Sequence, residues 1–305
     1  MDLGRPTVSI GNLTFGGTGK TPVTIAVARL LLDMGQRPAV LLRGYGRSTR
    51  GARLVGPADL ACDTGDEALL LARSLPEVPV AVGERREEAA ELVPRDCTLF
   101  LLDDGFQHLR VRRDLDLLLV DATRPGDLRA PPVGRLRESL SAVGRAQAIL
   151  VTRGSEADLP QALASFSWGR PLLGVRFLWE PKPVGLEGTT SWAELKGHPL
   201  ACFAGVGHPE AFFNQAMEHG LTLASRRVFP DHATPDPSRL RLILRDAQSH
   251  AARAVLTTEK DAVKWAPLWP SGAPPLFFPR LRVELAGDVD ALRALLARAC
   301  SAGPR

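Results

Sequence analysis

Several classes of protein are excluded by what the 305-residue chain lacks. Its four cysteines lie far apart without C-x-x-C spacing, which excludes a zinc ribbon or a disulfide framework and indicates free thiols. No run reaches the ~18 consecutive apolar residues that a membrane-spanning helix needs, and no secretory signal peptide is visible. The sequence therefore predicts a soluble or peripheral protein.

The net charge is also small, because 38 Lys and Arg against 34 Asp and Glu leave a formal net charge of +4. This surplus is too small to predict binding of nucleic acid. It comes mostly from arginine, which suits an anionic substrate or a membrane surface. With 45% apolar and 24% charged residues, the chain is predicted to be globular, with one large or two modest domains.

The strongest motif present is the glycine-rich segment TVSIGNLTFGGTGKTP at residues 7–22. A β-branched run leads into a turn, and an apolar helical pattern follows, which is the context of a phosphate-binding P-loop. Backbone N–H groups of such a loop surround phosphate oxygens, Lys20 would reach the β- and γ-phosphates, and Thr21 would coordinate Mg²⁺. The residues predicted to bind nucleotide here are Thr14, Phe15, Gly16, Gly17, Thr18, Gly19, Lys20 and Thr21.

One position departs from the usual pattern G-x-x-x-x-G-K-[ST], because Thr14 stands where the first glycine is expected. The alternative is an ordinary glycine-rich turn between a strand and a helix. Gly-Lys-Thr in this context favours the P-loop.

A second apolar run, residues 98–102, ends in Asp103 and Asp104. Paired acids at the end of a buried strand are typical of a Walker B element, which holds Mg²⁺ opposite the P-loop. A surface turn is the alternative, although burying unpaired charge is costly. We therefore predict a magnesium site from Thr21, Asp103 and Asp104, with Gln107 and His108 pointing into the same crevice.

Two basic segments are candidates for anion binding. Arg43 and Tyr45 follow the predicted strand 39–42, either as a tight turn with solvated arginines or as an anion-binding corner at a strand end. The Pro-rich loop 131–138 carries Arg137, whose guanidinium fork suits phosphate.

Three further polar groups are ambiguous from the residues alone. Asp66 opens a helical pattern, so a helix cap is favoured over a catalytic carboxylate. His232 follows an Asp in a Pro-bounded loop, which fits an exposed turn or a site residue equally well. The strand-end cluster Glu259, Lys260 and Asp261 resembles a guanine-reading loop, but Lys and Asp are adjacent, which argues against guanine specificity.

Alternating strands and helices predict an α/β fold with a doubly wound, mostly parallel sheet. We predict a P-loop domain over residues 1–170 and a linker hairpin over 171–198, with strands at 172–177 and 183–186. A smaller α/β domain would span 199–305, completed by a strand at 279–285 and a helix at 289–300. A G-x-G turn at 205–207 is a weak signal that could serve the turn alone.

Together these motifs resemble the tetraacyldisaccharide 4′-kinase family, the lipid A 4′-kinases of Gram-negative bacteria. The resemblance covers essentially the whole chain in order, and the Thr at position 14 is normal in that family. It is carried by the segments GGTGKTP (16–22), RGYG (43–46), GDE (65–67), DDGFQH (103–108), RE (137–138), FPDH (229–232) and TEKD (258–261).

The resemblance implies a RecA-like P-loop domain, a smaller α/β domain and a two-stranded linker. It implies transfer of the γ-phosphate of ATP, with Mg²⁺, to the 4′-hydroxyl of tetraacyldisaccharide 1-phosphate, which yields lipid IVA. It assigns catalysis to Lys20, Arg137 and an Asp66–His232 base dyad. We also predict substrate contacts from Arg43, Tyr45, Gln107, His108 and Arg137, and nucleotide contacts from the P-loop and from residues 259–261.

Partners and location follow from the same resemblance. It implies a peripheral monomer at the cytoplasmic face of the inner membrane, with a lipid substrate and no nucleic acid. Family members usually carry a hydrophobic or amphipathic segment before the P-loop strand, and this sequence lacks it, so a soluble protein is the alternative location. Two other functions remain open: a P-loop nucleotide switch and a kinase of a soluble small molecule.

Overall fold

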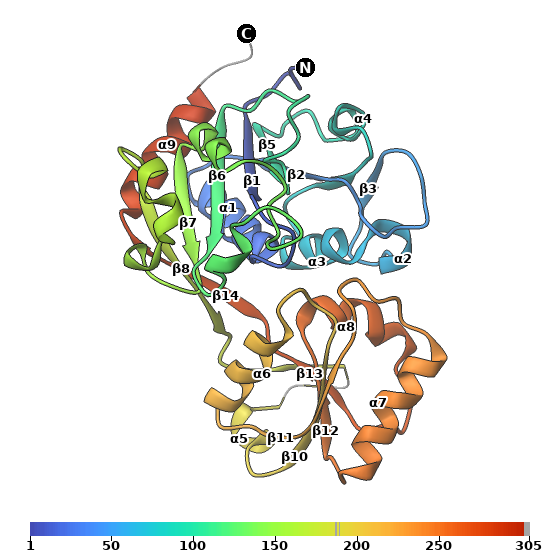
Figure 1. Ribbon diagram of the computed structural model, residues 1–305. Coiled ribbons are helices and arrows are strands. Elements are labelled where there is room, and N and C mark those ends of the chain that lie inside the picture. The colour runs from blue at the N-terminus through green and yellow to red at the C-terminus, as the bar shows by residue number, and fades with distance from the viewer. Residues whose placement is uncertain (187, 189, 302–305) are drawn as a thin grey trace.

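The computed structural model describes residues 1–301 except 187 and 189, and contains two α/β units (Figure 1). The large unit is built on a sheet with strand order β14-β8-β7-β6-β1-β5-β2-β4-β3. All neighbours pair in parallel except the two edge strands, β3 and β14, which confirms the predicted doubly wound, mostly parallel sheet. Its strands are β1 (Thr7–Asn12), β2 (Pro38–Leu42), β3 (Arg53–Val55), β4 (Val80–Val82), β5 (Leu99–Asp103), β6 (Leu115–Asp121), β7 (Ala148–Thr152), β8 (Leu172–Trp179) and β14 (Leu281–Gly287).

Helices cover both faces of this sheet, because its central strands are mostly apolar and are buried on both sides. Every residue of β1, β5 and β6 is buried. One face packs against α1 and α9, and the other against shorter helices and loops. The helices are α1 (Lys20–Asp33), α2 (Ala61–Thr64), α3 (Asp66–Ser74), α4 (Arg86–Glu91), α9 (Val289–Ser301) and the 3-10 helices η1 (Pro125–Asp127), η2 (Leu140–Arg145), η3 (Glu156–Asp158) and η4 (Gln161–Phe166).

The small unit has a second sheet, with order β11-β10-β12-β13-β9, in which only the edge strand β9 is antiparallel. Its strands are β9 (Val184–Gly185), β10 (Pro199–Ala204), β11 (Thr222–Val228), β12 (Ala254–Leu256) and β13 (Leu276–Phe278). Its helices are α5 (Trp192–Leu195), α6 (Pro209–Glu218), α7 (Pro237–Ser249), α8 (Glu259–Trp265) and the 3-10 helix η5 (Ala266–Leu268).

The connection between the units differs from the predicted hairpin over residues 171–198. β8 pairs antiparallel with β14, from Leu173↔Gly287 to Trp179↔Leu281, whereas β9 belongs to the small sheet. The two paired strands run together from the large unit to the small one (Figure 1). Extended character was predicted for all these segments, but the pairing partner of β8 lies about a hundred residues away and is set by tertiary packing.

The predicted small domain, residues 199–305, is therefore wrong at its C-terminal end. The C-terminal strand and helix complete the large unit, not the small one. Leu292, Leu296 and Ala299 of α9 are buried in the same core as Val8 of the central strand. The chain leaves the large unit after β8 and returns to it through β14.

Candidate active site

A cavity of about 750 Å³ lies between the two units, at the carboxyl ends of the central strands of the large sheet. This is where open α/β sheets place their ligand sites. The P-loop, the end of β5 and the loop before α3 line it from the large unit, and the loops after β10, β11 and β12 line it from the small unit. Both units therefore contribute to one site.

The glycine-rich segment forms the loop between β1 and α1, as the sequence predicts. Gly19 is the N-cap of α1 with φ 87°, and Gly16 has φ 118°, so both occupy backbone conformations that favour glycine. Lys20 Nζ lies 3.2 Å from Asn12 Oδ1 and 3.6 Å from Asp104 Oδ1. Thr18 Oγ1 is buried in the loop and has no hydrogen-bond partner among the described residues, which leaves it available to a ligand. The loop thus presents the helix N-terminus, a lysine and an unused hydroxyl to the cavity.

Asp103 ends β5 directly beside the start of α1. Its carboxylate accepts hydrogen bonds from Thr21 Oγ1 at 3.5 Å and from Thr24 Oγ1 at 3.1 Å. Burial, and next the negative charge of Glu67, raise the pKa of Asp103 to about 7. A hydroxyl and a buried carboxylate are the hard oxygen donors that Mg²⁺ prefers, and a divalent cation would hold Asp103 ionised.

The described residues offer no cluster of three or more His, Cys, Asp or Glu side chains able to hold a metal unaided. This fits Mg²⁺, which is usually bound by one or two carboxylates together with substrate phosphates. Asp104 is paired with Arg137. It has φ 55° and accepts two hydrogen bonds from Arg137 Nη1, at 2.8 and 2.9 Å.

Arg137 and Gln107 belong to one network that fastens the loop after η1 to the P-loop strand. Arg137 Nη1 donates to Gln107 Oε1 at 3.1 Å, and its guanidinium lies 5.2 Å from the centre of the Phe15 ring. Gln107 Nε2 donates to Asn12 O at 2.9 Å and to Glu138 Oε1 at 2.8 Å. Gln107 is therefore used for positioning, whereas Arg137 retains a buried Nε without a partner.

Asp66 of the large unit and His232 of the small unit are in contact, although they are 166 residues apart in the chain, and His232 lines the cavity while Asp66 is buried behind it. His232 Nδ1 lies 3.1 Å from both carboxylate oxygens of Asp66. The N-cap of α3 is Gly65 rather than Asp66, so the favoured interpretation of Asp66 as a helix cap is wrong. Burial alone would raise the pKa of Asp66, but the hydrogen bond to His232 and the positive charge of Lys260 hold it well below its usual range.

Lys260 sits on the other side of the His232 ring. Its Nζ lies 3.3 Å from His232 Nε2 and forms ion pairs with Glu67 at 3.0 Å and Asp231 at 3.3 Å. An ammonium group can only donate, so Nε2 must accept and the Nδ1 proton points to Asp66. Lys260 is thereby occupied with the dyad.

The other two residues of the predicted nucleotide-binding cluster, Glu259 and Asp261, lie in different surroundings. Glu259 lines the cavity, and burial raises its pKa to about 7. Asp261 is 1% exposed, and its carboxylate accepts from Gly205 N at 2.8 Å and Thr258 Oγ1 at 2.8 Å. The structure therefore corrects the assignment of Asp261 to nucleotide binding, because its oxygens are already committed inside the small unit.

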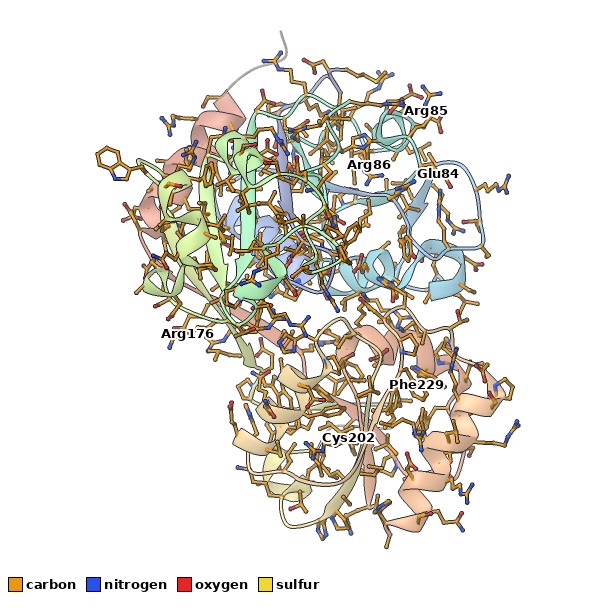
Figure 2. All side chains as sticks on the ribbon, viewed as in Figure 1. Glu84, Arg85, Arg86, Arg176, Cys202 and Phe229 are labelled. Carbon is orange, nitrogen blue, oxygen red and sulfur yellow. The ribbon has the colours of Figure 1, made fainter. Side chains whose placement is uncertain are left out.

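Arg43, Tyr45 and His108 line the cavity as predicted, and Tyr45 makes an edge contact with His232 at a ring distance of 5.0 Å. Sequence reasoning missed Arg86, which lies beside them at the start of α4, next to Arg85 and Glu84 (Figure 2). Arg86 is 3% exposed and makes no ion pair within residues 1–301 as described, and burial lowers its pKa to about 10. Its segment, GERREEAAE, is typical of a solvated helix, so the sequence carried no signal for it.

Arg153, after β7, was also missed. Its Nη2 donates to Gly17 O at 3.1 Å and its Nη1 pairs with Asp121 at 2.5 Å. A basic residue at the end of a predicted parallel strand was the available signal.

The G-x-G turn at 205–207 has a clear role in the structure, because it brings the small unit onto the P-loop. A Cβ atom on Gly207 would lie 2.5 Å from the backbone nitrogen of Gly17. On the linker strand, the Phe177 ring lies against Gly19 so closely that a Cβ there would overlap it. Only glycine allows both close approaches.

We expect Gly19→Ala to weaken ATP binding about tenfold or more, because alanine would adopt a strained positive φ and collide with Phe177. Gly35→Ala is the matched control, since Gly35 also has a positive φ of 74° but has open space around the Cβ position. Isothermal titration with ATP measures both variants. Equal affinity of Gly19→Ala and Gly35→Ala would contradict the close packing at Gly19.

Comparison with known proteins matches residues 1–301 to the family described as tetraacyldisaccharide-1-P 4′-kinase. Relatives named tetraacyldisaccharide 4′-kinase include one from Pelobacter propionicus, 40% identical over 96% of this chain and 84% of the relative. Another, from Geobacter metallireducens, is 38% identical over 87% of this chain and 80% of the relative.

Among solved structures, LpxK from Aquifex aeolicus in complex with ATP is similar with a TM-score of 0.74 and 28% identity, covering 98% of this chain and 90% of that one. None of the helices in the described part of the chain has the length and hydropathy needed to cross a bilayer. The match of whole chain, fold and motifs supports one conclusion: this protein is a member of the tetraacyldisaccharide 4′-kinase family, a family of ATP-dependent phosphotransferases.

Proposed function

We propose that the protein transfers the γ-phosphate of ATP to the 4′-hydroxyl of tetraacyldisaccharide 1-phosphate, forming lipid IVA. The observation that carries the proposal is that one cavity is lined by the P-loop lysine of the large unit and by His232 of the small unit, whose ring contacts the buried Asp66 carboxylate. A phosphoryl donor and a hydroxyl acceptor can therefore meet in it. The name of the matched family supports the choice of acceptor.

ATP phosphates would lie on the N-terminus of α1, within the loop of residues 14–21. Thr21 and Asp103 would hold Mg²⁺, with Asp104 beside them, where the ion would offset charge on the β- and γ-phosphates. Lys20 and Arg137 would bind the transferring phosphoryl group as its charge redistributes. The adenine would lie toward the apolar end of the cavity, which is lined by Phe177, Trp179, Phe212 and Leu281, with Glu259 nearby.

Asp66 would accept the proton of the 4′-hydroxyl, oriented by His232. Because transfer of a phosphoryl group passes through a loose transition state, the position of this carboxylate matters more than its basicity. The lowered pKa of Asp66 keeps it ionised and ready to accept the hydrogen bond of the hydroxyl at neutral pH.

The acceptor would enter beside Arg43, Tyr45, Arg86 and His108, whose positive and polar groups suit an anionic sugar. Gln107 would act indirectly, by holding Arg137. An acylated acceptor requires a membrane surface, so we place the protein peripherally at the cytoplasmic face of the inner membrane, as a monomer. Phe15, which lines the cavity and is 56% exposed, offers an apolar group there.

The test is transfer of ³²P from [γ-³²P]ATP to three acceptors: tetraacyldisaccharide 1-phosphate in detergent micelles, the same disaccharide without acyl chains, and no acceptor. We expect label in the acylated lipid only. Label in the deacylated sugar at equal efficiency would favour a kinase of soluble small molecules. Slow release of phosphate that no acceptor changes would favour a nucleotide switch.

A further inference from the structure

Lys264 is a buried lysine that none of the motifs discussed above includes. It lies one turn after Lys260 on α8, and its side chain is 6% exposed. Lysine is almost never buried unless it is paired. Its Nζ lies 3.0 Å from Asp261 Oδ1, 3.5 Å from Asp66 Oδ2 and 3.4 Å from Ala233 O.

These contacts place Lys264 against the proposed base on the side away from the cavity. His232 and Lys260 line the cavity, whereas Lys264 and Asp66 are buried behind them. Asp66 Oδ1 accepts a hydrogen bond from Glu67 N at 2.9 Å, and Asp66 Oδ2 faces Lys264. The carboxylate is therefore held at both oxygens, independently of its contact with His232.

Asp261 fixes Lys264 in turn. One oxygen of Asp261 accepts from Gly205 N at 2.8 Å, and the other pairs with Lys264. Gly205 begins the turn whose last residue, Gly207, touches Gly17 of the P-loop. A continuous set of contacts thus runs from the base, through Lys264 and Asp261, to the turn over the nucleotide loop.

We propose that Lys264 is a positioning residue, which orients the Asp66 carboxylate toward the acceptor and links it to the turn that contacts the P-loop. The inference rests on the proposed role of Asp66 as base. Lys264 touches neither nucleotide nor acceptor, so its loss should affect the chemical step more than ATP binding. Such a change lowers kcat and leaves KM nearly constant.

The competing explanation is that Lys264 only stabilises the small unit through its pair with Asp261. The two explanations differ in what they predict for kcat of the folded protein. The groups that face this carboxylate are His232, Lys260 and Lys264. Removing one of these positive charges raises the pKa of Asp66, so the acid limb of the kcat–pH profile moves to higher pH, which checks the contact itself. A lysine that only stabilises the small unit would lower the melting temperature and leave kcat on the pH plateau unchanged.

The experiment compares Lys264→Met, Lys264→Arg and the control Lys182→Met, an exposed lysine of the same chain, in the full-length protein with ATP and tetraacyldisaccharide 1-phosphate. We expect Lys264→Met to lower kcat about tenfold or more, with KM for ATP changed less than about twofold. The acid limb should shift upward, and Lys264→Arg should restore both. Wild-type kcat and an unshifted limb in Lys264→Met would overturn the proposal.

If Lys264→Met does not fold, Asp261→Asn decides the question, because it keeps the shape of the side chain and removes the charge that holds Lys264. We expect kcat to fall, and full kcat would overturn the proposal. Asp66→Asn in the same assay separates two kinds of failure. If Asp66→Asn keeps full turnover, the base assignment fails and the role of Lys264 with it. If Asp66→Asn loses turnover but Lys264→Met does not, only the inference about Lys264 fails.

Discussion

Replacing Asp66 by Asn is expected to lower kcat for transfer to the lipid by about two or more orders of magnitude, the range that a general base contributes. Asn keeps the volume of the side chain and one oxygen, so the contact with His232 at 3.1 Å can persist. What it removes is the negative charge and the capacity to take the proton. ATP affinity should stay within about twofold, because Asp66 does not line the nucleotide part of the cavity.

The measurement is single-turnover transfer of ³²P to tetraacyldisaccharide 1-phosphate, with ATP affinity determined in parallel. Asp66 also joins the two units, so loosening of the interface must be separated from loss of the base. Glu67→Gln is the matched control, because Glu67 forms the neighbouring ion pair across the same interface, with Lys260 at 3.0 Å. Equal losses in Asp66→Asn and Glu67→Gln would show that the interface, and not the base, limits turnover.

Replacing His232 is expected to lower kcat less than replacing Asp66 does. Its ring orients the carboxylate and shares the charge that develops on it, but its Nε2 is already engaged with Lys260. Its backbone has φ 58°, a conformation uncommon for a residue other than glycine, which aims the ring across the cavity.

The elements that depend on local pattern were predictable. β1, the P-loop and α1 follow from a glycine-rich turn between a β-branched run and an apolar helical period, and β5 with Asp103 follows from an apolar run ending in acids. The pairing of β8 with β14 was not predictable from the sequence, because strand propensity indicates extended backbone but not the partner strand. The position of α9 in the large unit follows from the same strand pairing, because α9 comes directly after β14.

The site shows the same division between local and tertiary information. Most of the predicted site residues line the cavity, and the exceptions are Thr14, Asp66 and Asp261. Arg86 and Lys264 are charged residues within helical segments, where solvation is the ordinary expectation. Their burial arises because α4 packs against β2 and β4 and α8 packs against α3, and nothing in the order of their residues indicates these contacts.

Replacing Lys20 by Met is expected to lower kcat/KM by about two to three orders of magnitude, the usual loss for a preorganised group that stabilises developing charge. Lys20 Nζ is already held between Asn12 and Asp104 at the mouth of the P-loop, and its side chain is 12% exposed. Met preserves the apolar stem and its packing. Asp104 remains paired with Arg137, so the melting temperature should change little. Lys20→Arg should restore only part of the activity, because a guanidinium fork does not replace a compact ammonium group.

Two measurements, phosphate transfer to lipid and ATP hydrolysis without lipid, separate the residues that act on the nucleotide from those that act on the acceptor. Lys20 acts on the phosphoryl group itself, so Lys20→Met should depress both transfer to lipid and the slow hydrolysis of ATP in water. Asp66 acts on the acceptor hydroxyl, so Asp66→Asn should depress transfer and leave that hydrolysis nearly intact. If Lys20→Met transferred phosphate within about threefold of the wild-type rate, the P-loop assignment of Lys20 would be wrong. Removing a lysine that contacts the transferred phosphoryl group lowers the rate by much more than that.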